Sequence, residues 1–215
     1  MKRRLFFPAL LLGLLTAGMI VVTARTRAAG LRQMHGVPFA ENKEDLAMLG
    51  QGDSFEDIFD LIRVRASSAL APQGASSYDA ERAHDSNLAT AWAPAANRRD
   101  GVGAYLEFSL RLNPQTEPDP SLRGMVIFNG YRKSRALWEA NNRVKQLRVT
   151  MNGKPYGVIT LADAYTNQRV DLGIIPLLPH SQINTIRFTI LSVYRGTKFH
   201  DTPISEIQFE GNGIY

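Results

Sequence analysis

The sequence has 215 residues, of which 44% are hydrophobic and 21% charged, a composition typical of a folded chain that excludes disorder of the whole. It contains no cysteine, which excludes disulfide frameworks, thiolate zinc sites, cysteine nucleophiles and lipoprotein anchoring. The net charge of +5 includes three basic residues before position 5, and without residues 1–24 the chain carries 22 basic against 20 acidic side chains, or +2. This near-neutral balance gives no indication of a nucleic-acid partner.

Residues 1–24 have the pattern of an export signal. Lys2, Arg3 and Arg4 precede an apolar run over residues 5–22, and small residues suited to cleavage follow up to Ala24. The run is longer than the usual signal core and close to the shortest span that crosses a bilayer. We therefore expect a signal peptide or an apolar helix that anchors the chain in the membrane. The rest of the protein is expected outside the cytoplasm, either secreted or periplasmic, or anchored by this segment.

Residues 25–61 read as an acidic linker, because they lack strand alternation and carry an excess of acid between residues 41 and 60. Ser54 and Asp57 resemble the start of a capping box. One helical face would then carry four apolar side chains, namely Phe55, Ile58, Phe59 and Ile62. This spacing predicts a short helix that either packs on the neighbouring domain or docks a partner.

Residues 62–211 carry a series of short apolar segments rich in β-branched and aromatic side chains and separated by turn residues. They are "AYLEFSL", "GMVIFNG", "VKQLRVTM", "YGVITL", "QRVDLG", "NTIRFTILSV" and "ISEIQFE". No amphipathic helix separates them, so the pattern predicts one all-β domain of antiparallel sheets, a sandwich or a barrel. Asn152-Gly153 predicts a two-residue hairpin turn, since both positions tolerate a positive φ.

The connection over residues 129–143 is long for a compact domain and strongly basic. Its charges could form a solvated face or pair with the acidic linker. Alternatively, Tyr131 and Trp138 offer rings that stack on a sugar, with hydrogen bonds or charge from nearby polar side chains. The candidate ligand-binding residues are Tyr131, Arg132, Lys133, Trp138, Asn142 and Arg143.

Three motifs, "RVRASSALAPQ", "AHDSNLATAW" and "PISEI", together resemble the discoidin domain, also called the coagulation factor 5/8 type C domain. The resemblance implies an eight-stranded jelly-roll sandwich of the galactose-binding-like class, with Trp92 in its core. Such domains usually bind glycans, lipids or proteins. The segments "GYRKS", "NNRVK" and "YRGTKFHDTPISEI" look like the branch associated with bacterial NAD glycohydrolases, where the domain serves in toxin translocation and is proposed to bind glycans.

The resemblance also implies a calcium loop that meets the closing strand. The candidate ligands are Asp85, Asn87, Thr90 and Glu206, joined by backbone carbonyls such as that of His84. Because only two of them are carboxylates, the expected affinity lies at the weak end, roughly 10⁻⁴ to 10⁻³ M. Ser86 stands where the family has glycine, which costs stability if the position needs a positive φ. The alternative is a hydrogen-bonded loop without a metal.

Catalytic motifs are absent from the sequence. The four histidines show no metal-ligand spacing, and no nucleophile elbow or phosphate loop is present. His200 beside Asp201 and the acid Glu206 suggest a hydrolase only weakly, because sequence neighbours on a strand face opposite sides. We expect no enzyme but an extracytoplasmic binding module for a glycan or another cell-surface ligand. The alternative is an interaction domain, tethered to the membrane if the N-terminal segment is retained, that docks a protein partner or an anionic surface through its basic loop.

Overall fold

A computed structural model describes residues 30–39, 59–95, 99–113 and 120–212. The described residues from Leu31 onward make up one compact unit. The expected apolar helix within residues 1–24 and the first part of the linker helix, Ser54 to Ile58, lie outside the described residues. Among the helices that the structure describes, none is long and apolar enough to cross a membrane.

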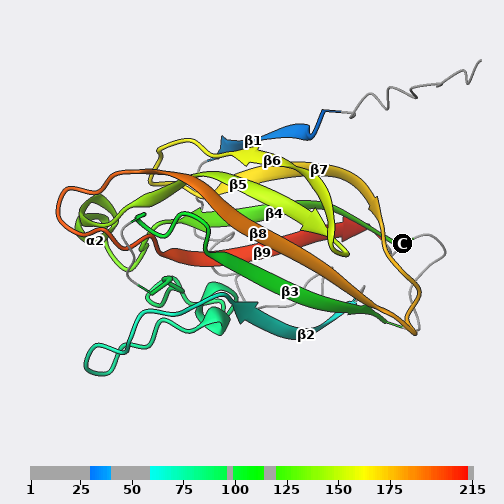
Figure 1. Cartoon of the computed structure of the whole chain (residues 1–215), viewed down its shortest axis with the longest axis horizontal. Helices are drawn as coiled ribbons and strands as arrows, with labels where there is room; N and C mark the ends of the chain where they lie inside the picture. Colours follow the sequence, from blue (N-terminus) through cyan, green and yellow to red (C-terminus); the bar gives the residue numbers. More distant parts are fainter. Residues whose placement is uncertain (1–29, 40–58, 96–98, 114–119, 213–215) are drawn as a thin grey trace, which may run out of the picture. The chain divides into compact units, whose positions relative to one another are not determined.

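The described chain folds into nine strands of one curled sheet, in the order β2-β3-β8-β5-β6-β1-β7-β4-β9 (Figure 1). The elements are β1 (Arg32–Pro38), β2 (Phe59–Ala66), the 3₁₀ turn η1 (Ala80–Ala83), β3 (Tyr105–Leu112), β4 (Ser121–Asn129), α2 (Arg135–Ala140), β5 (Arg143–Met151), β6 (Lys154–Thr160), β7 (Gln168–Pro176), β8 (Ile183–Tyr194) and β9 (Ile204–Asn212). The prediction of an all-β jelly-roll sandwich is confirmed, with nine strands where about eight were expected.

Strand β1 joins the two layers of the sandwich. Its first half, from Arg32 to His35, pairs in parallel with β6, and its second half, from Gly36 to Pro38, pairs antiparallel with β7. The other strand pairs of the described chain are antiparallel. Strands β2, β3, β8, β5 and β6 therefore form one layer, and β7, β4 and β9 form the other.

The segment interpreted as a linker contains more strand than the sequence suggested. Phe59–Ala66 is strand β2, so the helix predicted across Phe59 and Ile62 is wrong in this part. The register of β2 against β3 shifts between Leu61 and Arg63, which marks a bulge. Phe59 and Val64 consequently face the core while Ile62 is 42% exposed. The bulge breaks the two-residue alternation that would have revealed the strand.

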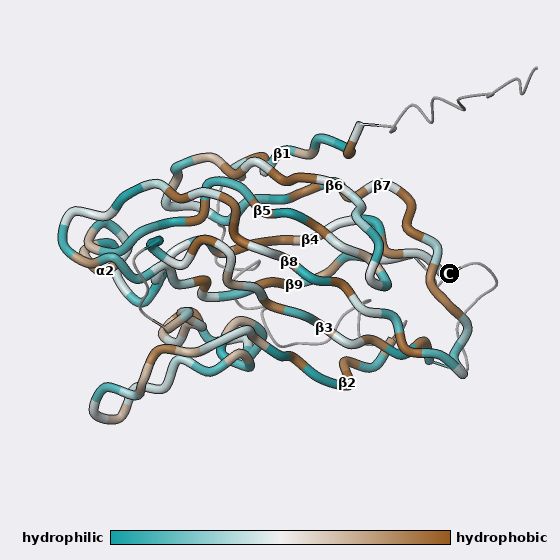
Figure 2. The backbone as a smooth tube through the Cα atoms, viewed as in Figure 1, coloured by the Kyte–Doolittle hydropathy of each residue, from teal (hydrophilic) through white to brown (hydrophobic). Residues whose placement is uncertain are grey.

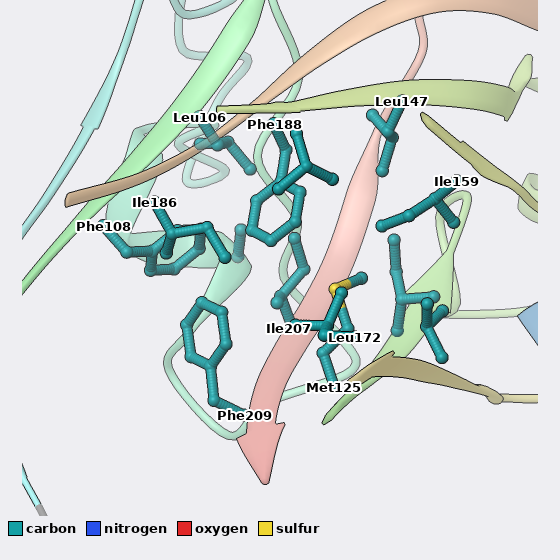
Figure 3. Close-up of a cluster of buried hydrophobic side chains, with 14 of the residues drawn as sticks. Leu106, Phe108, Met125, Leu147, Ile159, Leu172, Ile186, Phe188, Ile207 and Phe209 are labelled. Carbon is teal, nitrogen blue, oxygen red and sulfur yellow. The ribbon is translucent and has the colours of Figure 1, made fainter. Parts of the chain in front are cut away.

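The core lies between the layers, where buried apolar side chains from the strands meet (Figure 3). Figure 2 shows hydrophobic and hydrophilic residues interspersed along these strands. Phe108, Phe188 and Phe209 pack together with ring centroids 5.0 to 6.1 Å apart. Trp92 is fully buried and donates its indole N–H to the carbonyl of Ser68, as expected of a core residue. The hairpin turn between β5 and β6 is also confirmed, with φ of 49° at Asn152 and 75° at Gly153.

Candidate ligand-binding site

The long basic connection between β4 and β5 is an ordered turn followed by helix α2, at one end of the sandwich (Figure 1). Ser134 caps the helix by accepting a hydrogen bond from the backbone N–H of Leu137 at 3.2 Å. Gly130 turns the chain into this connection with a φ of 82°. A Cβ atom at Gly130 would lie 2.6 Å from Cδ1 of Trp138, so the ring packs where only glycine leaves room.

Trp138 and Arg143 hold this connection together from inside. Trp138 is 7% exposed and donates its indole N–H to the carbonyl of Asn129 at 3.0 Å. The guanidinium of Arg143 stacks 4.5 Å from the Trp138 ring and forms a bidentate pair with Asp163 at 2.8 and 2.9 Å. It also donates to the carbonyls of Asn141 and Arg195. Both side chains are therefore committed to internal contacts.

Asn142 fixes the connection from β8 to β9 against this end of the sandwich. Its side chain donates to the carbonyl of His200 at 2.8 Å and accepts from the backbone N–H of Gly196 at 2.9 Å. Its backbone N–H donates to the carbonyl of Asp201 at 2.9 Å. The backbone N–H groups of residues 197–199 donate to the last carbonyls of α2, those of Glu139 and Ala140. Together these bonds set the positions of Phe199 and Asp201.

A pocket of about 170 Å³ opens beside this connection. Its walls are mainly aromatic and apolar, with two amides and one carboxylate: Leu70, Gln73, Tyr78, Ala93, Tyr131, Leu137, Asn141, Phe199, Asp201 and Pro203. The rings of Tyr78 and Tyr131 meet edge to face with centroids 6.3 Å apart. Phe199 is 38% exposed, so part of its ring is available from solvent. Burial, with a smaller contribution from Tyr78, raises the pKa of Tyr131, which keeps its hydroxyl neutral.

The structure brings only one of the six sequence-predicted ligand residues, Tyr131, into the pocket. Trp138, Asn142 and Arg143 are buried and serve as the frame described above. The other two also lie outside the pocket: Arg132 is 6% exposed, with its guanidinium 4.3 Å from the centroid of the Tyr165 ring, and Lys133 is exposed.

Sequence reasoning missed the other nine pocket residues, among them Tyr78, Phe199 and Asp201. A lone phenylalanine in the polar stretch "GTKFHDTP" was the one available signal. Tyr78 lies in an irregular segment without periodicity, and Asp201 was considered only as a partner of His200. His200 instead pairs with Asp100 at 2.9 Å.

The four sequence-predicted calcium ligands lie on a loop after η1 and on β9. The Thr90 hydroxyl is 2.8 and 2.9 Å from the two carboxylate oxygens of Asp85. The side-chain carbonyl of Asn87 accepts from the backbone N–H of Ala89 at 3.0 Å. Glu206 contacts the same loop, since its Oε2 accepts from the backbone N–H of Ser86 at 3.1 Å.

Glu206, on β9 beside this loop, is a buried acid with a strongly raised pKa. It is 1% exposed, and its Oε1 has no hydrogen-bond partner in the structure. His84 lies near, with Nδ1 3.7 Å from Oε1, but this nitrogen bonds the carbonyl of Ile207 at 2.6 Å. Burial, reinforced by the charge of Asp85, raises the pKa of Glu206 to about 8.

An orphaned carboxylate oxygen beside a second carboxylate fits a hard cation such as calcium, which takes oxygen ligands. The hydroxyl of Thr90 and the amide of Asn87 complete a donor set of this chemistry. No group of three or more His, Cys, Asp or Glu side chains that could hold a metal ion occurs among the residues that the structure describes. Ser86 adopts a φ of 56°, so the position where the resembling domains have glycine does require the left-handed region.

Comparisons with known proteins agree with this architecture. The model of the NAD glycohydrolase translocation F5/8 type C domain family matches residues 57–210. The chain belongs to this family. A search of curated proteins found no match to the F5/8 type C chain.

Two solved structures resemble this F5/8 type C domain in fold. The CBM32-1 and CBM32-2 domains of Clostridium perfringens ZmpB superpose with a TM-score of 0.54 at 10% identity, over 86% of this chain and 42% of that one. A structure of the same domains with the M60 catalytic domain gives 0.52 at 9% identity, over 85% and 17%. The chain therefore spans less than half the length of either protein, and the likeness establishes the fold alone.

Proposed function

We propose that this F5/8 type C domain is a non-catalytic, extracytoplasmic binding module whose pocket takes carbohydrate. The pocket itself supports the proposal. The partly exposed ring of Phe199, beside the buried ring of Tyr131 in the pocket wall, suits the apolar face of a sugar ring, while Gln73, Asn141 and Asp201 supply hydrogen-bonding groups for its hydroxyls. The CBM32 fold of the structural neighbours is consistent with this use. The export-signal pattern of residues 1–24 in the sequence supports the proposed location.

The pocket is small. At about 170 Å³ it lies below the roughly 300 to 1,000 Å³ of sites for drug-sized ligands, so it suits a single sugar ring at the end of a chain. An affinity in the millimolar range is expected of one ring with few contacts.

Calcium fits the proposal as a structural ion. The ion would be held by Asp85, Asn87, Thr90 and Glu206. Its positive charge would compensate the two carboxylates. The 85–90 loop would thereby be tied to β9. The ion has no part in ligand chemistry here, because none of these four side chains lines the pocket.

The alternative of docking through a basic loop has less support. Arg132 and Arg143 are buried, and the exposed Arg135 pairs with Glu139 at 3.0 Å. The loop therefore does not present its charges as one patch.

Titration of monosaccharides followed by NMR tests the proposal. The variant Phe199→Ala removes the partly exposed ring on which the sugar is proposed to stack and keeps the fold. It should therefore weaken binding at least fivefold. Lys133→Ala is the matched control, because Lys133 is an exposed residue at the same end of the sandwich but does not line the pocket. If no hexose or hexosamine shifts the resonances of pocket residues at 50 mM, or if Phe199→Ala binds as the wild type does, the sugar site is refuted.

A further inference from the structure

The pocket has one charged side chain, Asp201, and this carboxylate lacks a counterion. Among the contacts of the described residues, its backbone carbonyl accepts from Asn142, but its side chain makes no hydrogen bond or ion pair. Burial raises the pKa of Asp201, and the nearby His200 opposes this only in part. The carboxylate therefore stands half-buried in a largely apolar wall without the partner that such groups normally have.

The cationic side chains around Asp201 are engaged elsewhere. His200 and Arg195 both bind the carboxylate of Asp100, each at 2.9 Å, and both side chains are mainly exposed. Lys198 directs its ammonium to the ring of Phe199, with Nζ 5.1 Å from the centroid. The protein thus leaves the negative charge of the pocket unmatched.

The aromatic walls reinforce this electrostatic character. The faces of Tyr78, Tyr131 and Phe199 carry negative π density, which attracts a cation and not an anion. An ammonium group that enters the pocket would donate a charge-assisted hydrogen bond to the carboxylate of Asp201 and lie beside these rings. A neutral hydroxyl can bond the carboxylate but leaves its charge uncompensated.

We propose that the pocket recognises an amine-bearing sugar, a hexosamine with a free ammonium group, and that Asp201 determines this specificity. The inference rests on the proposed carbohydrate site and adds the charge of the ligand. The pocket volume limits the recognised unit to about one ring, so the ligand is the terminal or exposed residue of a de-N-acetylated glycan.

Three monosaccharides test this specificity at pH 6, where the free amine is protonated: glucosamine, N-acetylglucosamine and glucose. Glucosamine should bind about tenfold more tightly than the two neutral sugars, because a charge-assisted hydrogen bond is about twice as strong as a neutral one. Its affinity should also fall as sodium chloride rises from 50 to 500 mM, while that of glucose should not.

The variant Asp201→Asn keeps the shape of the side chain and the backbone bond to Asn142, so the fold is preserved. It should lower glucosamine affinity about tenfold, to that of glucose, and leave glucose binding within twofold. Lys133→Ala should change neither. Equal affinity of the wild type for all three sugars, or an unchanged preference in Asp201→Asn, overturns the ammonium inference and leaves the carbohydrate site standing. Failure of all three sugars to bind overturns the ammonium inference, and the carbohydrate site falls with it when the other hexoses and hexosamines also fail to bind.

Discussion

The buried carboxylate of Glu206 makes the stability of the calcium-free protein depend on pH. Burial and the charge of Asp85 hold its pKa at about 8, against 4.5 for an exposed glutamate. Between these pH values the folded protein retains a proton that the unfolded chain has released. The free energy of unfolding therefore falls as the pH rises, and it levels off above about pH 8, where both states are ionised.

The size of the effect follows from these two pKa values. Each pH unit between them costs about 1.4 kcal/mol, so raising the pH from 5 to 7 should remove between about 2 and 3 kcal/mol of stability. In a domain of about 150 residues this loss lowers the Tm by roughly 5 to 10 °C.

Urea and thermal unfolding from pH 5 to 7.5 in chelator measure this contribution as the difference between wild type and Glu206→Gln. The glutamine variant cannot ionise, so it should lack this pH trend and be the more stable protein at pH 7. Glu210→Gln is the matched control on the same strand, since Glu210 pairs with the exposed Arg169 and is itself partly exposed. It should retain the wild-type trend.

Calcium should offset part or most of the wild-type trend. At 10 mM and with a dissociation constant of roughly 10⁻⁴ to 10⁻³ M, the ion should add about 1 to 3 kcal/mol at pH 7, and less at pH 5, where Glu206 is protonated. Glu206→Gln should lose most of this gain. Parallel pH curves for wild type and Glu206→Gln in chelator would falsify the linkage argument. A wild-type Tm that is the same in calcium and in chelator at pH 7 would end the calcium proposal.

Two further substitutions test the 85–90 loop and the frame of the pocket. Ser86→Gly relieves a left-handed backbone at φ 56°, and urea denaturation should show a gain of about 0.5 to 1 kcal/mol; a loss would mean that the serine side chain stabilises the loop. Trp138→Ala removes a buried ring, leaves the carbonyl of Asn129 unpaired and deprives Arg143 of its stacking surface, so it should cost about 3 to 5 kcal/mol. A cost below 1 kcal/mol, comparable with that of the exposed Lys133→Ala, would contradict the structural role of Trp138.

The sequence predicted the strands that stand out as dense apolar runs between turn residues and missed those that do not. The seven apolar segments from residue 104 onward correspond to β3 to β9, because their β-branched and aromatic residues mark them even where a register shift interrupts the pairing, as between Val144 and Leu147. Strand β2 escaped notice because its bulge gives Phe59 and Val64 an irregular spacing. Strand β1, "RQMHGVP", has only Met34 buried, so no pattern of core contacts marks it.

The candidate site was less predictable, because distant segments create it. Tyr78 and Asp201 come from segments more than 100 residues apart, and no local pattern signals that they line one pocket. Trp138 illustrates the opposite difficulty: an aromatic in a basic loop suggests a sugar platform, but burial and the hydrogen bond to Asn129 decide that it is structural. The contact between Asp85 and Thr90 was easier to predict, since both lie within one short motif, and calcium binding by this loop stays a prediction.

The double pairing of β1 has a mechanical consequence. A pulling force applied along the chain from the N-terminal side would reach Arg32 first and load the four residue pairs with β6 before the three with β7. A load directed along the axis of β1 shears these pairs together, whereas a load directed across it opens them one at a time. Once β1 is extracted, the edges of β6 and β7 lose the strand that joins them, and the two layers can part. Because this short strand pairs with both layers, its detachment would be the first step when the domain is unfolded by force from its N-terminal end.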